Sequence, residues 1–316
     1  MRRTGFLYDD RYLLHETSSV HPEQSKRLIA IYKGIEDAGI LERLCHVEGV
    51  RADMQWVEAV HDLAYIRRFG AACRMGHTTF DSMDNQMCAD TYDTALYVVG
   101  GILRITDLLM GGQIDNGFCA VRPPGHHAEP TRAGGFCYFN NVAIAAKYLQ
   151  MKWGVRKVGI FDFDVHHGNG TQAIFEQDST VYYYSIHQHP TFAYPGTGRE
   201  FERGTGAGHG YTRNYPMLPG QGDKEYFEAI ERDFIPTFEV FQPEVIILST
   251  GFDAHAEDDM SDIKVSSAGF LRIIRTVRDL ADRLCGGRLV SVLEGGYCLQ
   301  RLPELAGDHV RTLLED

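Results

Sequence analysis

The stretch Val158–Gly170, with the sequence VGIFDFDVHHGNG, constrains the fold of this chain more than any other. Its first half is a short apolar run of the kind found in strands that are buried on both faces of a parallel sheet. Acids, histidines and an amide follow within eight residues: Asp162, Asp164, His166, His167 and Asn169. Because open α/β sheets bind ligands at the carboxyl ends of their strands, the stretch predicts an α/β fold with a polar site after this strand.

Asp164 and His166 are the residues of this stretch that best fit a metal ion. Alternate residues of an extended backbone point to the same side, as two ligands of one ion require. Burying such groups without compensation costs several kcal/mol each, so a metal, a mutual pairing or water is needed. The alternative is that the acids cap a helix or accept backbone hydrogen bonds. We favour the metal.

Composition limits the partners and the compartment. The formal net charge of the 316 residues is −12 and no Lys/Arg-rich run is present, so we expect no nucleic-acid partner. Seven cysteines without a Cys-x-x-Cys pair do not form a typical disulfide framework, which favours a reducing, cytoplasmic location. The amino-terminal MRRTGFLYDD reaches acidic residues before an apolar h-region can form, and no run approaches 18 apolar residues, so we expect neither a signal peptide nor a membrane span.

Alternating strand and helix patterns extend over the whole chain. Further apolar runs that predict strands lie at Phe6–Tyr8, His46–Val50, Phe118–Val121, Val181–Ile186, Val245–Ser249 and Leu289–Leu293. Helical patterns lie between Leu28 and Gly39, in Asp53–Arg74 with a break at His61-Asp62, in Thr91–Met110, after a possible N-cap at Asn140, and in Lys224–Phe241, Ala268–Leu284 and Leu302–Leu314, whereas Met75–Asp84 reads as a polar loop. This order predicts a single domain, residues 1–316, with a mostly parallel sheet covered on both faces.

Four loops that follow predicted strands carry reactive side chains, and parallel strands would bring them to one edge of the sheet. They contain His126 and His127, then Asp164 and His166, then Asp253, and finally Tyr297. Two carboxylates and an imidazole make a three-ligand set that leaves a fourth position for water, as in catalytic zinc sites. We interpret His255, two residues beyond Asp253, as a surface side chain rather than a fourth ligand.

The paired histidines and Tyr297 supply groups for acid-base chemistry. His126 and His127 could take a proton from water and return it to a leaving group. The alternative is two solvated histidines in a turn after Pro123-Pro124-Gly125. The Tyr297 hydroxyl could stabilise a developing oxyanion, although Gly-Gly-Tyr is equally compatible with an ordinary turn.

Five motifs, in order and at matching intervals, resemble the zinc-dependent histone deacetylase superfamily. They are RPPGHHA from Arg122, GFCYFN from Gly135, DFDVHHGNGT from Asp162, GFDA from Gly251 and LEGGY from Leu293, and TGFLYDD and HPEQSKRL near the start also fit. Asn169 and Glu294 resemble the variants of class II deacetylases and their bacterial relatives, which include histone deacetylase-like amidohydrolases and acetylpolyamine amidohydrolases.

The resemblance implies an arginase/deacetylase-like three-layer α/β/α fold and assigns roles to individual residues. Zinc would be held by Asp164, His166 and Asp253. His127 would act as general base and then acid, with Tyr297 as oxyanion donor and His126 as an electrostatic partner. Asp162 would orient His126, and Asn169, an aspartate in class I, would orient His127 while lowering its basicity. A structural potassium ion would lie at Asp162, Asp164, His166, Ser185 and Ile186.

The same resemblance indicates the substrate class. Gly135, Phe136 and Tyr194 match the wall of a narrow tunnel for an acyl-lysine stem, although aromatic residues also commonly pack in cores. Met260 stands where polyamine-selective relatives have a gatekeeping glutamate. We therefore expect a hydrolase that removes acetyl or other short acyl groups from lysine in proteins or peptides.

Other functions stay open at this point. Acetylpolyamine deacetylation is the first alternative, because a loop with Asp81 and Asp84 and the pair Asp258-Asp259 could make the rim of the site acidic. An inactive acyl-lysine binding module is a second, although His126, His127 and Tyr297 are all present. An arginase-like dimetal hydrolase would need more acids, and a serine hydrolase would need a Gly-x-Ser-x-Gly elbow. The sequence is compatible with a homo-oligomer.

Overall fold

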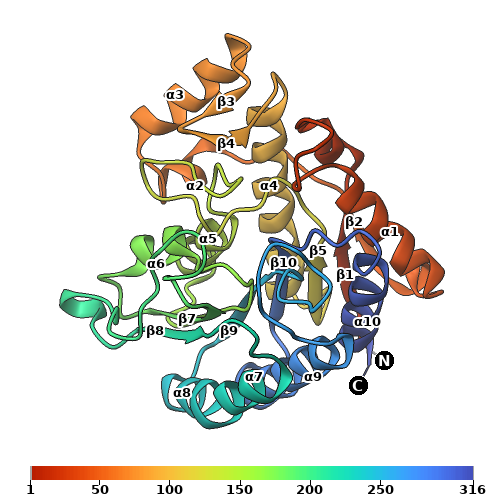
Figure 1. Ribbon diagram of the computed structural model, residues 1–316, viewed down its shortest axis with the longest axis vertical. Coiled ribbons are helices and arrows are strands. Elements are labelled where there is room, and N and C mark those ends of the chain that lie inside the picture. Colours follow the sequence, from red (N-terminus) through yellow and green to blue (C-terminus); the bar gives the residue numbers. More distant parts are fainter. Residues whose placement is uncertain (1, 316) are drawn as a thin grey trace.

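The computed structural model describes residues 2–315, and its centre is an eight-stranded sheet in which every neighbouring pair of strands is parallel (Figure 1). The strand order is β2-β1-β5-β10-β9-β6-β7-β8. The strands are β1 (Thr4–Leu7), β2 (Cys45–Val47), β5 (Asn116–Cys119), β6 (Val158–Asp162), β7 (Val181–Gln188), β8 (Thr212–Met217), β9 (Val245–Thr250) and β10 (Leu289–Leu293). The predicted parallel sheet is confirmed.

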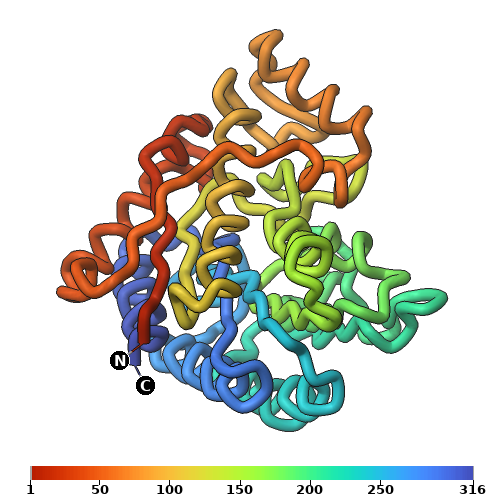
Figure 2. Tube along the Cα trace, turned by 180° about the vertical axis from the view of Figure 1, so that it is seen from behind, coloured from red at the N-terminus to blue at the C-terminus, as the bar shows by residue number. Residues whose placement is uncertain are grey.

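Helices cover both faces of the sheet. On one face, α4 (Thr91–Met110) packs beside α5 (Asn141–Trp153), and Figure 2 shows these two helices from behind. On the other face, α10 (Leu302–Leu314) lies between α1 (Lys26–Asp37) and α9 (Ser267–Cys285), and both α9 and α10 contact strands. This arrangement is a three-layer α/β/α architecture.

Shorter elements surround these layers. They are α2 (Met54–Glu58), α3 (Leu63–Arg74), α6 (Asn169–Phe175), α7 (Asp223–Ala229), α8 (Ile235–Phe241), the one-turn helices η1 (Asp10–Leu14), η2 (Leu41–Arg43) and η3 (Gly206–Gly208), the π-helical turn η4 (Ile230–Phe234), and a small antiparallel pair, β3 (Thr79–Phe80) with β4 (Ser82–Gln86).

Local chemistry explains the elements that lead to the site. All five residues of β6 are buried, as expected for a central strand with helices on both faces. The Asn140 side chain accepts a hydrogen bond from the Ala143 amide and so begins α5, as predicted. Gly154 ends this helix in the left-handed conformation, with φ of 68°.

The structure corrects several predicted elements. The Met75–Asp84 segment is not all loop, because it contains β3 and the start of β4. Strand β8 escaped prediction because its sequence, TRNYPM, is polar and contains a proline, which is tolerated at the edge of the sheet where β8 lies. The helix predicted at Lys224–Phe241 is divided into α7 and α8 by the π-helical turn η4.

Two sequence expectations concern the whole chain. None of the helices within residues 2–315 has an apolar stretch long enough to cross a lipid bilayer. All seven cysteines are free thiols. The single-domain prediction stays a prediction, and it includes Met1 and Asp316, which lie outside the described residues.

Candidate metal and catalytic site

Asp164, His166 and Asp253 lie together beyond the carboxyl ends of the central strands β6 and β9. Each offers one ligand atom, and these three atoms lie within 4.8 Å of one another. His166 Nδ1 lies 3.2 Å from Asp164 Oδ1 and 3.2 Å from Asp253 Oδ2. All three side chains are buried. The fold therefore brings together residues that are nearly ninety positions apart in the sequence.

The donor set fits a divalent cation. Backbone amides hold both carboxylates: Gly295 N donates to Asp164 Oδ2 at 2.7 Å, and Val165 N donates to Asp253 Oδ1 at 3.0 Å. Burial, followed by the neighbouring charge of Asp164, raises the pKa of Asp253 to about 6. Two buried carboxylates in one site call for a compensating positive charge, and an imidazole with two carboxylate oxygens is a ligand set that zinc accepts.

His126 carries a positive charge beside this cluster. Its Nδ1 lies 3.0 Å from Asp162 Oδ2, which also accepts a hydrogen bond from the Tyr183 hydroxyl at 3.0 Å. Burial opposes protonation, but the carboxylates of Asp162, Asp164 and Glu294 overcome it and raise the pKa of His126 to about 10. The surrounding carboxylates therefore favour the protonated form of His126.

His127 has the opposite character. Its ring centre lies 4.0 Å from that of His126, and its Nδ1 lies 2.8 Å from Asn169 Oδ1. Burial, followed by the positive charges of His126 and His166, lowers the pKa of His127 well below its ordinary value. The pair therefore divides into one charged and one neutral imidazole, and the neutral ring can accept a proton.

Tyr297 lies in the loop that follows β10. Burial raises the pKa of its phenol well above the ordinary value, so the hydroxyl keeps its proton. Its ring makes an edge contact with Phe136 at 6.0 Å between centres, and the Arg27 guanidinium lies 4.8 Å from the ring centre. A protonated hydroxyl of this kind can donate to an oxygen that gains negative charge.

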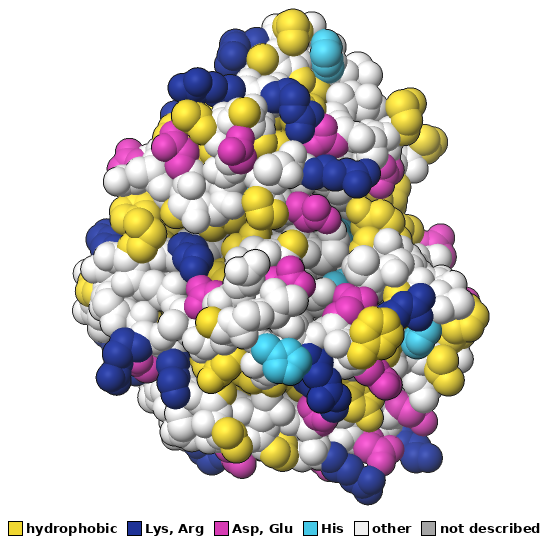
Figure 3. Space-filling model, turned by 90° about the vertical axis from the view of Figure 1, so that its left-hand side faces the viewer, with side chains coloured by type: hydrophobic (Ala, Val, Ile, Leu, Met, Phe, Trp, Pro, Cys, Tyr) yellow, Lys and Arg dark blue, Asp and Glu magenta, His cyan; other side chains and the backbone are white. Residues whose placement is uncertain are grey.

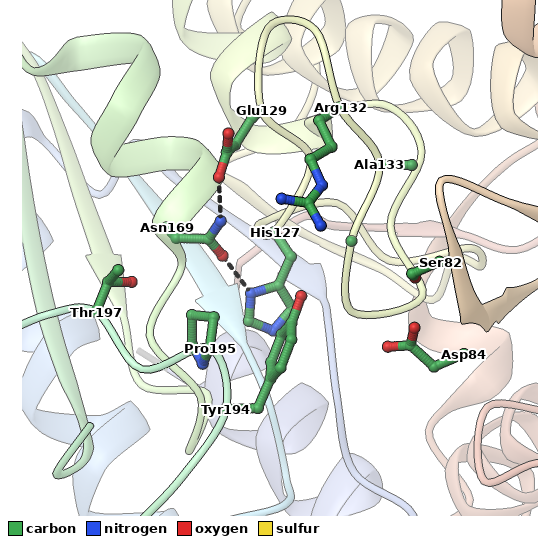
Figure 4. Close-up of a pocket in the computed structure, with 11 residues that line it drawn as sticks. Ser82, Asp84, His127, Glu129, Arg132, Ala133, Asn169, Tyr194, Pro195 and Thr197 are labelled. Carbon is green, nitrogen blue, oxygen red and sulfur yellow. Dashed lines mark hydrogen bonds between the residues drawn. The ribbon is translucent and has the colours of Figure 1, made fainter. Parts of the chain in front are cut away.

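A pocket of about 290 Å³ opens beside His127 (Figure 4). Tyr194 lies along its wall, with its ring edge-on to His127 at 4.9 Å between centres. Gly135 takes φ of +50°, and a Cβ atom there would lie only 2.2 Å from His127 Cδ2, so a side chain at this position would displace the histidine. In the view of Figure 3 the surface is hollowed, with acidic side chains at the edge of the hollow.

Of the other residues expected around the tunnel, some lie at the pocket and others do not. Phe136 is half-buried and packs against His21 at 4.7 Å between ring centres as well as against Tyr297. Met260 is half-buried in the segment after Asp253. Asp84 lines the pocket, as expected for an acidic rim, whereas Asp81 is committed to an ion pair with Arg68.

Two expectations for the segment after Asp253 were wrong. His255 is not a surface side chain: it is only 3% exposed and its Nε2 lies 3.1 Å from Ser267 Oγ, because the loop folds back against α9. Asp258 is not a rim acid either. It is buried and accepts the backbone N–H groups of Tyr297 at 2.6 Å and Cys298 at 2.8 Å, so it supports the Tyr297 loop.

The potassium site stays a prediction. Asp162 and Ser185 are register partners on β6 and β7, so the expected ligands are neighbours across two strands. The Ser185 hydroxyl lies 2.7 Å from His187 Nδ1. Ile186 follows on β7 and is buried.

Sequence reasoning missed a set of buried charges behind the site. The Glu23 carboxylate contacts both Arg27 and Arg122, and Arg27 donates in turn to the carbonyls of Glu294 and Gly296, each at 2.6 Å. Glu294 itself accepts the Gly125 amide at 2.6 Å, and burial raises the pKa of its carboxyl to about 7. The signal was present in the HPE and RPPGHH motifs, which were matched without a role for their charges.

The central sheet is all-parallel and lies between two layers of helices, and one of its edges carries a buried Asp-His-Asp cluster and a histidine pair. This combination is typical of metal-dependent hydrolases. Comparison with known proteins makes this specific. A model of the histone deacetylase domain matches residues 21–313, and the chain belongs to the histone deacetylase family.

Relatives and a solved structure agree with this assignment. A probable deacetylase of Archaeoglobus fulgidus is 38% identical over 299 residues, which cover 94% of this chain and 82% of the relative. The histone deacetylase-like amidohydrolase of Pseudomonas aeruginosa is 34% identical, with 100% and 88% covered. The crystal structure of the HDA15 HD domain superposes with a TM-score of 0.94 at 36% identity, covering 99% of this chain and 88% of that one.

Proposed function

We propose that this chain is a zinc-dependent deacetylase that removes acetyl or other short acyl groups from lysine side chains of proteins or peptides. The observation that carries the proposal is His127, held through Nδ1 by Asn169 Oδ1 at 2.8 Å, beside the buried Asp164, His166 and Asp253 cluster. A deacetylase needs a base that is unprotonated near neutral pH next to the group that polarises the amide. An inactive binding module would have no need of this combination.

Zinc held by Asp164, His166 and Asp253 would supply Lewis acidity toward the acyl carbonyl and lower the pKa of water. The protein residues would perform the proton transfers. With Nδ1–H donated to Asn169 Oδ1, His127 keeps Nε2 free to take the proton of the attacking water and to return it to the amine. The Tyr297 hydroxyl would donate to the developing oxyanion.

Asp162 Oδ2, 3.0 Å from His126 Nδ1, would accept the Nδ1–H of His126 and favour a positive charge on its ring. Burial, and after it a positive charge on the adjacent His126, keeps the pKa of His127 low in the resting state. The same charge would favour return of the proton to the leaving amine, because an imidazolium at His127 is then a stronger acid. The two histidines therefore have different roles although they are adjacent.

Aromatic side chains favour an acyl-lysine substrate. The half-exposed Tyr194 beside His127 and Phe136 beside Tyr297 offer apolar ring surface for a methylene chain. Met260 adds no charge that would select a second amine. The acetylpolyamine alternative keeps one observation in its favour, the Asp84 carboxylate in the pocket wall.

A turnover panel tests the proposal. The zinc-loaded protein is given acetyl-, longer acyl- and trifluoroacetyl-lysine peptides beside acetylputrescine and acetylspermidine, before and after chelation. We expect chelation to abolish turnover, zinc to restore it, and peptides to be the faster substrates. Faster turnover of the acetylpolyamines would make them the proposed substrate class in place of acyl-lysine. Binding of acyl-lysine without turnover of any substrate would contradict the assignment as a deacetylase.

A further inference from the structure

Glu129 lies where its charge can act on His127 through one intervening amide. Asn169 Nδ2 donates to Glu129 Oε1 at 2.7 Å, and Asn169 Oδ1 lies 2.8 Å from His127 Nδ1 (Figure 4). The three side chains form a continuous chain of hydrogen bonds along the wall of the pocket. We propose that Glu129 is a positioning residue that sets the orientation of the Asn169 amide and thereby the tautomer of His127.

Hydrogen-bond chemistry gives the direction of this control. An ionised carboxylate only accepts hydrogen bonds, so the end of the Asn169 amide that faces Glu129 must be the NH₂ group. The amide oxygen, which also only accepts, is then left to face His127. The proton of His127 must therefore reside on Nδ1, and the lone pair on Nε2.

The backbone around Glu129 fixes this carboxylate in place. The N–H of Glu129 donates to the carbonyl of Arg132 at 2.9 Å in a short β-bridge, and its own carbonyl lies 3.0 Å from His61 Nδ1. The start of α6 is held equally closely, since a Cβ atom on Gly170 would lie 2.3 Å from the carbonyl oxygen of Ala128. Close packing of these segments brings Glu129 and Asn169 together.

This arrangement revises the expectation for Asn169. The sequence suggested that an asparagine, where class I relatives have aspartate, removes the anionic partner of His127. The structure instead has a carboxylate one amide further away, which polarises Asn169 toward His127 in a partly buried environment. The negative charge near His127 is therefore not lost, because it lies on Glu129, one side chain beyond Asn169.

The inference rests on the proposed function, and the kinetic test uses acyl-lysine turnover by the zinc-loaded protein. Glu129→Ala should lower kcat by roughly 10- to 100-fold, as loss of the hydrogen-bond partners that orient metal ligands does, with little change in KM. Glu58→Ala is the matched control because Glu58 is exposed on α2. Wild-type kcat in Glu129→Ala would overturn the inference.

A double-mutant cycle separates positioning from a merely structural role. Asn169→Asp alone sets two carboxylates against each other and should lower kcat. In the Glu129→Gln background the new amide can donate to the carboxylate introduced at position 169, so the same substitution should raise kcat above that of Glu129→Gln alone. Equal effects of Asn169→Asp in both backgrounds would contradict the proposal.

A readout without turnover distinguishes this inference from the proposed function. Long-range ¹H–¹⁵N NMR of the histidine rings reports the His127 tautomer directly. We expect Nδ1–H in the wild type and in Glu58→Ala, and a mixture of tautomers in Glu129→Ala. An unchanged tautomer in Glu129→Ala refutes the role of Glu129. If the wild type turns over no acyl substrate but Glu129→Ala still loses the Nδ1–H preference, only the proposed function is refuted.

Discussion

Replacing Glu23 with glutamine should destabilise the folded protein by about 3 kcal/mol. The Glu23 carboxylate is fully buried and lies between two fully buried arginines. Its oxygens lie 2.8 Å from Arg122 Nε and 2.8 Å from Arg122 Nη2, and a further contact of 3.2 Å joins it to Arg27 Nη1. Burial opposes ionisation, but the Arg122 charge above all holds the pKa of Glu23 well below its ordinary value.

The magnitude follows from what the substitution leaves behind. Glutamine has nearly the same shape and keeps one acceptor oxygen, so little volume is lost. The two guanidinium groups would then share one neutral amide oxygen besides their backbone carbonyl partners, and removing one member of a buried ion pair costs about 3–5 kcal/mol. The retained acceptor puts Glu23→Gln at the lower end of that range, a large part of a typical folding free energy of about 5–15 kcal/mol.

Urea unfolding followed by circular dichroism measures this change. The midpoint should shift to lower urea in Glu23→Gln while the slope stays the same, and Glu16→Gln, which alters an exposed glutamate, should match the wild type. A destabilisation below about 1 kcal/mol would refute the reasoning, because it would mean that the two arginines do not depend on this carboxylate.

Activity should fall for a related reason. Arg27 holds the carbonyls of Glu294 and Gly296 and lies against the Tyr297 ring, so loss of its anionic partner frees the Tyr297 loop. We expect a lower kcat in Glu23→Gln at temperatures where circular dichroism shows the variant fully folded. An unchanged kcat under those conditions would show that the buried Glu23 charge does not help to position Tyr297.

Three further predictions follow from the site and its surroundings. Gly295→Ala would set a Cβ atom 2.2 Å from one site carboxylate and 2.5 Å from the other, so zinc content by mass spectrometry should fall sharply, whereas Gly70→Ala within α3 should keep it. Tyr297→Phe should lower kcat on acyl-lysine peptides by about 10²–10³, and wild-type turnover would remove the hydroxyl from the mechanism. Burial lowers the pKa of His61 from 6.5 to about 4, so its neutral form stabilises the fold above pH 6.5 and this contribution is lost as the pH falls toward 4. The loss should reach about 3 kcal/mol, and urea unfolding of His61→Gln should show a shallower pH dependence over that interval.

Periodicity and strand ends were enough to predict the architecture. Buried runs such as Val158–Asp162 can be recognised locally, because a central parallel strand is apolar on both faces. Edge elements lack that signal: β8 contains a proline and polar residues, and the β3–β4 pair has only two residues in its first strand. Their pairing depends on neighbours that no local pattern identifies.

The same distinction holds for the site. Asp164, His166 and Asp253 could be nominated because each directly follows a buried strand, and parallel strands end at one edge. Whether they bind zinc stays a prediction. Asp258 and His255 were misjudged because a polar residue in a loop was assumed to face solvent, while this loop folds inward and uses the Asp258 carboxylate to bind the backbone of Tyr297.

Side chains that act through another side chain are the hardest to predict from sequence. Read by itself, Asn169 indicates a neutral partner for His127 and a weaker base. Glu129 changes that interpretation, but it lies 40 positions away and reaches Asn169 only because α6 begins against the backbone that follows His127. An amide can transmit orientation only if its far end is held, so the function of position 169 depends on the residue at position 129. A substitution at either position should therefore be judged with the other, as the double-mutant cycle would measure.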